Sequence, residues 1–301
     1  MGLFQKYSAQ VSLLLEIIPF IAKENCFALK GGSAINLFYQ NLPRLSVDLD
    51  LVYLPLESRE KAVAGINEVL FRLSKKFCEF GYSSIVQGSK DEKKIICSNQ
   101  NATVKIEPNY TIRGTLLPPC IKSVSKKVQE QFGYAKMNVL DFPELYAGKI
   151  CAALDRQHPR DLFDVRKLYE QNECISDDIL NCFVVYLIGH NRPIHELLDC
   201  TMKDSKDAYE KEFLGMTDEK ISYKELQETL STLKSDLKQK LSVHKKFLLD
   251  FVRLEADFSL LPFVNAKDLP AVKWKMRNLE QLRQVDKEKF NLQHAKLAAL
   301  L

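Results

Sequence analysis

The sequence predicts an α+β protein, with a mixed sheet flanked by helices followed by a mainly α-helical part. Strand-like runs at residues 27–29, 46–54 and 102–110 alternate with helical stretches in the first half of the chain. The back half shows almost only helical periodicity. A chain of 301 residues is long enough for two domains, which we place at residues 1–172 and 173–301.

The first elements are read from apolar spacing and turn residues. Apolar side chains recur at helical spacing over residues 4–22, which predicts an amphipathic helix. The short apolar run at residues 27–29 meets a Gly-Gly-Ser turn at 31–33, and a helical pattern follows at 34–39. A strand at residues 46–54, which ends at a proline, comes next.

The middle of the chain continues this alternation. A long amphipathic helix is expected at residues 57–80, and strands are expected at 95–97 and 102–110. The motif Asp-Phe-Pro-Glu at 141–144 is typical of a helix start, with an acidic N-cap and a glutamate three residues later. That helix runs to about residue 156, and another is expected at 160–171.

Composition narrows the class of protein. Hydrophobic residues make up 46% and charged residues 27% of the chain, which excludes wholesale disorder. The net charge of +4 neither demands nor excludes a nucleic-acid partner. The apolar stretch at residues 11–22 contains Glu16 and Pro19 and is too short to span a bilayer, so no membrane partner is expected. The eight cysteines form no C-x-x-C pair, so we expect buried thiols and a cytoplasmic location.

Asp48 and Asp50 are the most informative residues. They alternate along a predicted strand, so both side chains project from the same face. Adjacent carboxylates repel each other and require a cation between them or a raised pKa. Their oxygens suit Mg²⁺ or Mn²⁺. The alternative is an edge strand with a solvated acidic face, but the strongly apolar flanks favour a lined cleft.

Gly32 and Ser33 lie at the predicted turn between strand and helix. Glycine lets backbone N–H groups approach a phosphate, and a helix N-terminus favours negative charge. The Ser33 hydroxyl is a further phosphate donor. The alternative is a plain turn in which Ser33 is the helix N-cap. The spacing excludes both a P-loop and a dinucleotide-binding fingerprint.

A second group of charged residues lies in the two later helices. Lys149 stands in an otherwise small and apolar segment, so it either snorkels out of the core or reaches into a site. Asp161 and Asp164 share a helix face, and Arg160 is four residues from Asp164. The alternative for the second helix is an acidic N-terminus with an ordinary Arg–Asp pair.

The turn, the helix and the D-x-D strand together resemble the DNA polymerase beta-like nucleotidyltransferases. In that superfamily a third carboxylate on a later strand completes the metal site, and Glu107, which shares a strand face with Lys105, is the candidate. The ordered motifs also resemble the AbiEii/AbiGii toxin family of nucleotidyltransferases over about residues 26–282. The motifs that carry this second resemblance lie at residues 29–39, 43–51, 143–149, 160–164, 192–198, 213–217 and 274–278.

The resemblance implies a polymerase beta-like nucleotidyltransferase domain, followed by a helical domain, and a set of site residues. The implied metal ligands are Asp48, Asp50 and Glu107, the nucleotide contacts are Gly32, Ser33, Lys149, Arg160 and Asp164, and the catalytic residues are Asp48, Asp50, Lys149 and Asp161. Both Asp161 and Asp164 match the family pattern. We favour Asp161 as the essential aspartate because it comes first in its helix, where it can position Lys149 or the acceptor.

The resemblance further implies two-metal nucleotidyl transfer from an NTP to an acceptor hydroxyl, with Mg²⁺ or Mn²⁺ as cofactor. Family members are toxins of type IV toxin–antitoxin systems, so we expect an RNA acceptor such as tRNA and a separate antitoxin. Transfer to a protein or small molecule, and a non-catalytic nucleotide-binding module, are the alternatives. Basic residues of the helical half either hold the RNA or form a solvated helix face, namely Lys245, Lys246, Lys273, Lys275, Arg277 and Arg283.

Overall fold

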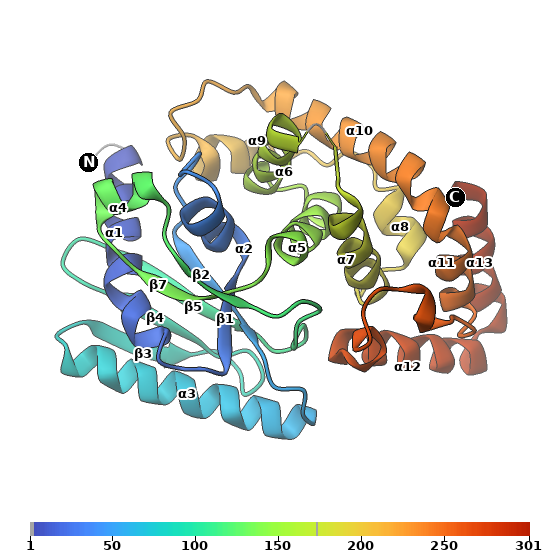
Figure 1. The fold of residues 1–301 in the computed structure, drawn as a ribbon, viewed down its shortest axis with the longest axis horizontal. Helices are drawn as coiled ribbons and strands as arrows, with labels where there is room; N and C mark the ends of the chain where they lie inside the picture. The colour runs from blue at the N-terminus through green and yellow to red at the C-terminus, as the bar shows by residue number, and fades with distance from the viewer. Residues whose placement is uncertain (1–2, 173) are drawn as a thin grey trace. The chain divides into compact units, whose positions relative to one another are not determined.

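The computed structural model of the protein describes residues 3–172 and 174–301, so residue 173, the first of the predicted helical domain, lies outside the described residues. The chain divides into two compact units, one formed by Met1–Leu145 with Lys211–Lys220 and the other by Tyr146–Glu210 with Ile221–Leu301. Figure 1 shows the elements of both units. The predicted α+β class is confirmed.

The described part of the first unit contains a seven-stranded mixed sheet in the order β3-β4-β5-β2-β1-β7-β6. The strands are β1 (Phe27–Lys30), β2 (Asp48–Tyr53), β3 (Ser83–Gln87), β4 (Lys94–Ser98), β5 (Thr103–Asn109), β6 (Cys120–Ser123) and β7 (Lys136–Val139). Strand β2 runs antiparallel to β1 on one side and parallel to β5 on the other, so the centre of the sheet contains both kinds of strand pairing.

One face of this sheet is apolar throughout its centre. Leu51 lies opposite Leu29 on β1, and Leu49 lies opposite Ile106 on β5, and all four side chains are buried. Helices α1 (Leu3–Ile21) and α3 (Arg59–Glu79) pack against the strands, and Figure 1 shows α3 lying along β3 and β4. Because strand residues alternate between faces, the polar residues of β2 and β5 necessarily point to the opposite side.

The remaining elements of the first unit are short. They are α2 (Gly31–Ser33), the π-helix η1 (Ala34–Tyr39) and α4 (Lys126–Phe132). Sequence patterns did not predict α4, β6 or β7, because each spans few residues and β6 has an alternating exposed face at the sheet edge. Strand β7 nevertheless matters, since it pairs in parallel with β1 beside the Gly-Gly-Ser turn.

The second unit is helical throughout its described residues, as predicted. Its elements are α6 (Pro159–Asn172), α7 (Asp177–Ile188), α8 (Ile194–Leu198), α9 (Lys206–Ala208), α10 (Tyr223–Lys240), η3 (Leu241–His244), α11 (Lys245–Val252), η4 (Phe258–Leu260), η5 (Ala266–Asp268), α12 (Pro270–Val285) and α13 (Lys287–Leu300). The π-helix η2 (Tyr209–Phe213) leads into the returning segment of the first unit. Ser222 and Glu225 form a capping box that starts α10.

Helix α5 (Phe142–Asp155) contains the division between the units, which falls between Leu145 and Tyr146. This division lies ahead of the sequence-based boundary between residues 172 and 173. The difference has a physical reason, because α6 packs against α10 and therefore belongs with the helices that follow it.

Two expectations about the whole chain can be compared with the described residues. None of the described helices has the length and apolar character needed to cross a membrane. No disulfide joins the eight cysteines within the described chain. Burial differs from the expectation for four of them, because Cys26 and Cys120 are half-buried and Cys78 and Cys174 are exposed.

Candidate functional site

The two aspartates of the D-x-D motif begin strand β2. Asp48 and Asp50 are its first and third residues, both are half-buried, and the intervening Leu49 is fully buried on the apolar face. The two carboxylates therefore share the polar face of the sheet, as the alternation of a strand requires. A buried leucine between them fixes the strand against rotation about its own axis.

Glu107 lies on the neighbouring strand at the height of Asp50. The parallel pairing of β2 with β5 makes Glu107 the register partner of Asp50 and Lys105 the partner of Asp48. Paired residues of adjacent strands project to the same side of a sheet. The structure thus brings the three predicted carboxylates, Asp48, Asp50 and Glu107, onto one face.

Glu107 is held by a lysine. The Nζ atom of Lys94 lies 2.9 Å from Glu107 Oε1, and the two side chains are 34% and 38% exposed. Among residues 3–172 and 174–301, no three His, Cys, Asp or Glu side chains form a ready-made metal site. The carboxylate donors on this face suit a hard divalent cation, and the third donor is engaged by Lys94.

Gly31 places the glycine turn against this face. Its φ of +72° lies in the left-handed region, which glycine adopts without strain. A Cβ atom at Gly31 would lie 2.3 Å from Asp50 Oδ2, so any side chain there would displace the carboxylate. Sequence reasoning assigned the ligand-contacting role to Gly32, whereas the close approach to the acidic face is made at Gly31.

Gly32 and Ser33 lie against the segment that leads into β2. A Cβ atom at Gly32 would lie 2.7 Å from Nη2 of the buried Arg44. The Ser33 hydroxyl is buried, donates to the backbone carbonyl of Asp48, and lies 3.0 Å from the Ser46 hydroxyl. Ser33 is the N-cap of η1, as the plain-turn alternative expected, but its side chain makes no capping hydrogen bond there.

A second charged group lies in the other unit, on α5 and α6. Lys149 is only 6% exposed, and its Nζ atom lies 2.7 Å from Asp161 Oδ1 and 3.0 Å from Asp164 Oδ2. Arg156, which is mostly exposed, donates from Nε and Nη2 to the two oxygens of Asp161. Both carboxylates are fully buried, so their charges depend on these cations.

The electrostatics of Asp161 follow from this arrangement. Burial by itself would raise the pKa of Asp161, but the charges and hydrogen bonds of Lys149 and Arg156 outweigh it and hold the pKa below its usual range. Asp161 is therefore a carboxylate at neutral pH. The expectation that Asp161 positions Lys149 agrees with this contact, and Asp164 makes the same contact from the next turn of the helix.

Arg160 is the second residue of α6 and is half-buried. Its backbone N–H donates to Nδ1 of His158, 3.1 Å away, which satisfies one of the donors at the start of the helix. The structure thus assembles the predicted residues as two groups, and these groups belong to different compact units.

Three residues near these groups were not predicted from sequence. Lys94 engages Glu107, Arg44 lies against Gly32, and Arg156 forks onto Asp161. Arg44 stands four residues before Asp48 in the sequence, so its position was a usable signal. Lys94 gave no such signal, because its contact depends on strand register.

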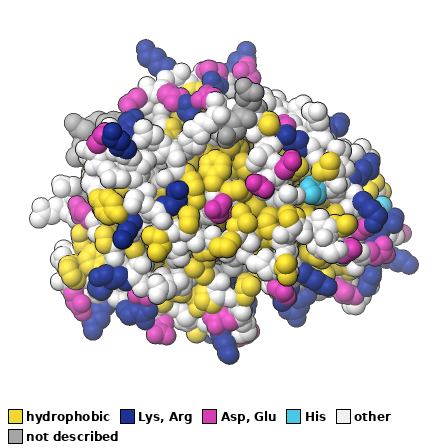
Figure 2. All heavy atoms as spheres, viewed as in Figure 1, with side chains coloured by type: hydrophobic (Ala, Val, Ile, Leu, Met, Phe, Trp, Pro, Cys, Tyr) yellow, Lys and Arg dark blue, Asp and Glu magenta, His cyan; other side chains and the backbone are white. Residues whose placement is uncertain are grey.

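The basic residues of the helical half are mostly engaged within their own unit. Lys275 is buried and donates to the carbonyls that follow α7, those of His190, Asn191 and Arg192. The prediction that Lys275 contacts RNA is therefore wrong, because its ammonium is bonded inside its own unit. Three more of the candidate side chains are in ion pairs, namely Lys246 with Asp250, Lys273 with Asp268, and Arg283 with Glu280. On the face shown in Figure 2, Lys and Arg are interleaved with Asp and Glu.

Comparisons with known proteins agree with the fold and with the family resemblance. The profile of a family described as "Nucleotidyl transferase AbiEii toxin, Type IV TA system" matches residues 12–278. Among solved structures, the chain is similar to MenT4, a nucleotidyltransferase toxin from Mycobacterium tuberculosis H37Rv, with a TM-score of 0.58 over 97% of this chain and 94% of that chain. The two sequences are 14% identical, so this likeness concerns the fold. No curated protein matches the chain.

Proposed function

The chain belongs to the AbiEii family of nucleotidyl transferase toxins of type IV toxin–antitoxin systems, and from this premise we propose that it transfers a nucleoside monophosphate from an NTP to a hydroxyl group of RNA, such as a tRNA. The observation that carries the proposal is the alignment of Asp50 with Glu107 beside Asp48 on one face of the sheet. Three hard carboxylate donors on adjacent strands are the ligand type that Mg²⁺ or Mn²⁺ requires.

In this proposal Asp48, Asp50 and Glu107 would hold two divalent cations. When bound, such cations neutralise the triphosphate and lower the pKa of the acceptor hydroxyl. Asp48 or a neighbouring carboxylate takes the hydroxyl proton. The acceptor oxygen forms a bond to the α-phosphorus, the bond from the α-phosphorus to the bridging oxygen breaks, and pyrophosphate leaves.

The glycine turn and the buried cluster have supporting roles. Gly32 and Ser33 contribute backbone N–H groups to the triphosphate, while the Ser33 hydroxyl fixes the start of β2 through the Asp48 carbonyl. Lys149 binds the triphosphate, and Asp161 orients Lys149. Because the proposed reaction uses Lys149 and Asp161, we propose that the nucleotidyltransferase domain extends through residue 172.

A radiolabel-transfer assay tests this function. The protein is incubated with Mg²⁺, each α-³²P-labelled NTP in turn, and total RNA or protein extract as acceptor, beside the Asp48→Ala variant. Label in RNA that is absent with the variant is the expected result, and it identifies the base that is transferred. Label found only in protein would show that the acceptor is a protein and not RNA. An equal amount of label transferred by the Asp48→Ala variant would refute the role of Asp48.

A further inference from the structure

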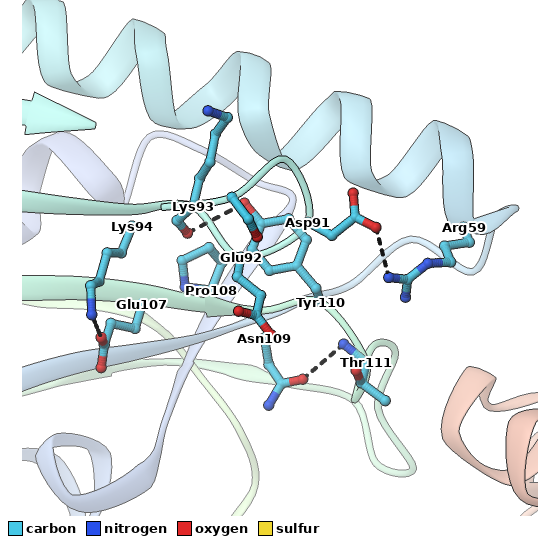
Figure 3. Close-up of a pocket in the computed structure, with 11 residues that line it drawn as sticks. Arg59, Asp91, Glu92, Lys93, Lys94, Glu107, Pro108, Asn109, Tyr110 and Thr111 are labelled. Carbon is cyan, nitrogen blue, oxygen red and sulfur yellow. Dashed lines mark hydrogen bonds and ion pairs between the residues drawn. The ribbon is translucent and has the colours of Figure 1, made fainter. Parts of the chain in front are cut away.

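Beside the carboxylate face, the first unit contains a pocket of about 640 Å³. It lies where β5 ends and the turn between β3 and β4 approaches the start of α3. Glu107 and Lys94 both line it, so the pocket adjoins the proposed metal-binding face (Figure 3). Its lining is polar and carries both signs of charge.

The charges of this pocket balance in the structure. Its basic side chains are Arg59, Lys93 and Lys94, and its acidic side chains are Asp91, Glu92 and Glu107. Two of the cations are neutralised directly, because Arg59 lies 2.9 Å from Asp91 and Lys94 lies 2.9 Å from Glu107. The pocket therefore presents little net charge to a ligand while these pairs persist.

The side chains of the two adjacent lysines point in different directions. Figure 3 shows the ammonium of Lys93 directed toward α3, in agreement with its position 5.4 Å from the ring centre of Phe71. The ammonium of Lys94 points instead along the sheet to Glu107. Of these two lysines, Lys94 is thus the one that can exchange between a carboxylate on the sheet and a ligand in the pocket.

We propose that Lys94 is a displaceable counter-ion of Glu107: a divalent cation that binds Glu107 releases Lys94 into the adjoining pocket, where its ammonium binds a phosphate group. This inference rests on the proposed function, because it takes Glu107 as a metal ligand. An ion pair that is about one-third exposed is weak enough for a divalent cation to replace. Its release changes the pocket from balanced to net positive.

Release of Lys94 links the binding of the cation to the binding of phosphate. If the cation releases Lys94 and the phosphate binds Lys94, each ligand raises the affinity for the other by the same factor. Removing the charge of Lys94 then does two opposite things. It raises the affinity for the cation, because Glu107 no longer has a competitor, and it abolishes the coupling with phosphate.

The first measurement is Mn²⁺ affinity, by calorimetric titration of the wild type and of Lys94→Met, Lys94→Arg and Lys105→Met. Lys105→Met is the matched control, because Lys105 is on the same face of β5 as Glu107 and is the register partner of Asp48. We expect Lys94→Met to bind Mn²⁺ about fivefold more tightly and Lys94→Arg to bind like the wild type. A change in Lys94→Met no larger than in Lys105→Met would overturn the proposal.

The second measurement is phosphate binding with and without saturating Mn²⁺, with two probes that distinguish the source of the phosphate. One probe is a fluorescein-labelled oligoribonucleotide, followed by anisotropy, and the other is a non-hydrolysable NTP analogue. We expect Mn²⁺ to tighten one probe about fivefold more in the wild type than in Lys94→Met, and that probe names the phosphate donor. Equal enhancement in both proteins for both probes would refute release of Lys94 into the pocket.

The same titration separates this inference from the function on which it rests. Asp48→Asn is expected to weaken Mn²⁺ binding in every Lys94 background. If the wild type binds Mn²⁺ through Asp48 but Lys94→Met is unchanged, only the counter-ion role fails. If the wild type does not bind Mn²⁺, the metal face of the proposed function fails as well.

Discussion

Replacement of Lys149 by methionine should destabilise the second unit as well as abolish transfer. Methionine keeps much of the length and apolar surface of the lysine but removes its charge. The Lys149 ammonium contacts Asp161 and Asp164, and both carboxylates are fully shielded from solvent. In the variant, Arg156 still forks onto Asp161, whereas Asp164 loses the ammonium and has a second carboxylate nearby.

The magnitude follows from the burial of this cluster. Removing one partner of a buried ion pair costs about 3–5 kcal/mol, because the remaining charge keeps its desolvation penalty but loses that partner's attraction. For a chain of 301 residues that corresponds to a fall in Tm of about 5–8 °C. The control is Lys224→Met, which removes an exposed partner of Glu228 and should change stability by less than about 0.5 kcal/mol.

The loss of stability in Lys149→Met should depend on pH in a definite direction. In the wild type the pKa of Asp161 is lowered, so its contribution to stability is present above its unfolded pKa of about 4 and is lost as the pH falls through the lower folded pKa. In Lys149→Met two neighbouring buried carboxylates lose the ammonium that they share, and protonation at lower pH relieves their repulsion. The stability deficit of the variant should therefore be largest near about pH 7 and smaller near about pH 5.

Thermal unfolding followed by circular dichroism at these two pH values is the assay. We expect a lower Tm for Lys149→Met at both pH values, with the smaller difference from wild type at the lower pH. A variant that unfolds within about 2 °C of the wild type at neutral pH would refute the reasoning. Lys149 would then be a ligand-binding residue without a structural role in the cluster.

Two further predictions concern the glycine turn and the buried lysine of α12. Gly31→Ala should lower the transfer rate at least about tenfold, because its Cβ atom would displace the Asp50 carboxylate. Gly133 has a φ of +99° and open space around it, so Gly133→Ala should show only a backbone cost of about 1–3 kcal/mol. Kinetics and urea unfolding of both variants check this, and equal rates for the two would contradict it. Burial lowers the pKa of Lys275 to about 8, whereas its pKa in the unfolded chain is about 10.4. Between these two pH values the unfolded chain binds more protons than the folded chain. The free energy of unfolding therefore increases as the pH rises, by up to about 3 kcal/mol. Urea unfolding across this pH range should show that gain in the wild type and a flatter profile in Lys275→Met, and identical profiles would contradict it.

The long elements were predictable because their apolar periodicity is strong. The helix expected at residues 57–80 is α3, Arg59–Glu79, and the strand expected at residues 102–110 is β5, Thr103–Asn109. Strands β6 and β7 have only four residues each, too few for a periodic pattern. Their pairing comes from the tertiary fold, which a local pattern does not contain.

In the candidate site, too, only the features that depend on one element were predictable from the sequence. Alternation along one strand was enough to place Asp48 and Asp50 on a common face. The contact between Lys94 and Glu107 requires the register of two strands, since the pairing of Ile95 with Ile106 is what sets Lys94 opposite Glu107. Residues that meet through register, or through a turn as Arg156 meets Asp161, are not visible in the sequence of either element alone.

The central claim is that the carboxylate face of the sheet performs nucleotidyl transfer. The most direct test compares the rate of label transfer from α-³²P-NTP to RNA in the wild type, in Asp48→Asn and in Asp178→Asn, an exposed aspartate of the helical unit, with Tm measured for all three. We expect Asp48→Asn to lose transfer by at least about a thousandfold at an unchanged Tm, and Asp178→Asn to retain it. Undiminished transfer by a folded Asp48→Asn protein would contradict the claim.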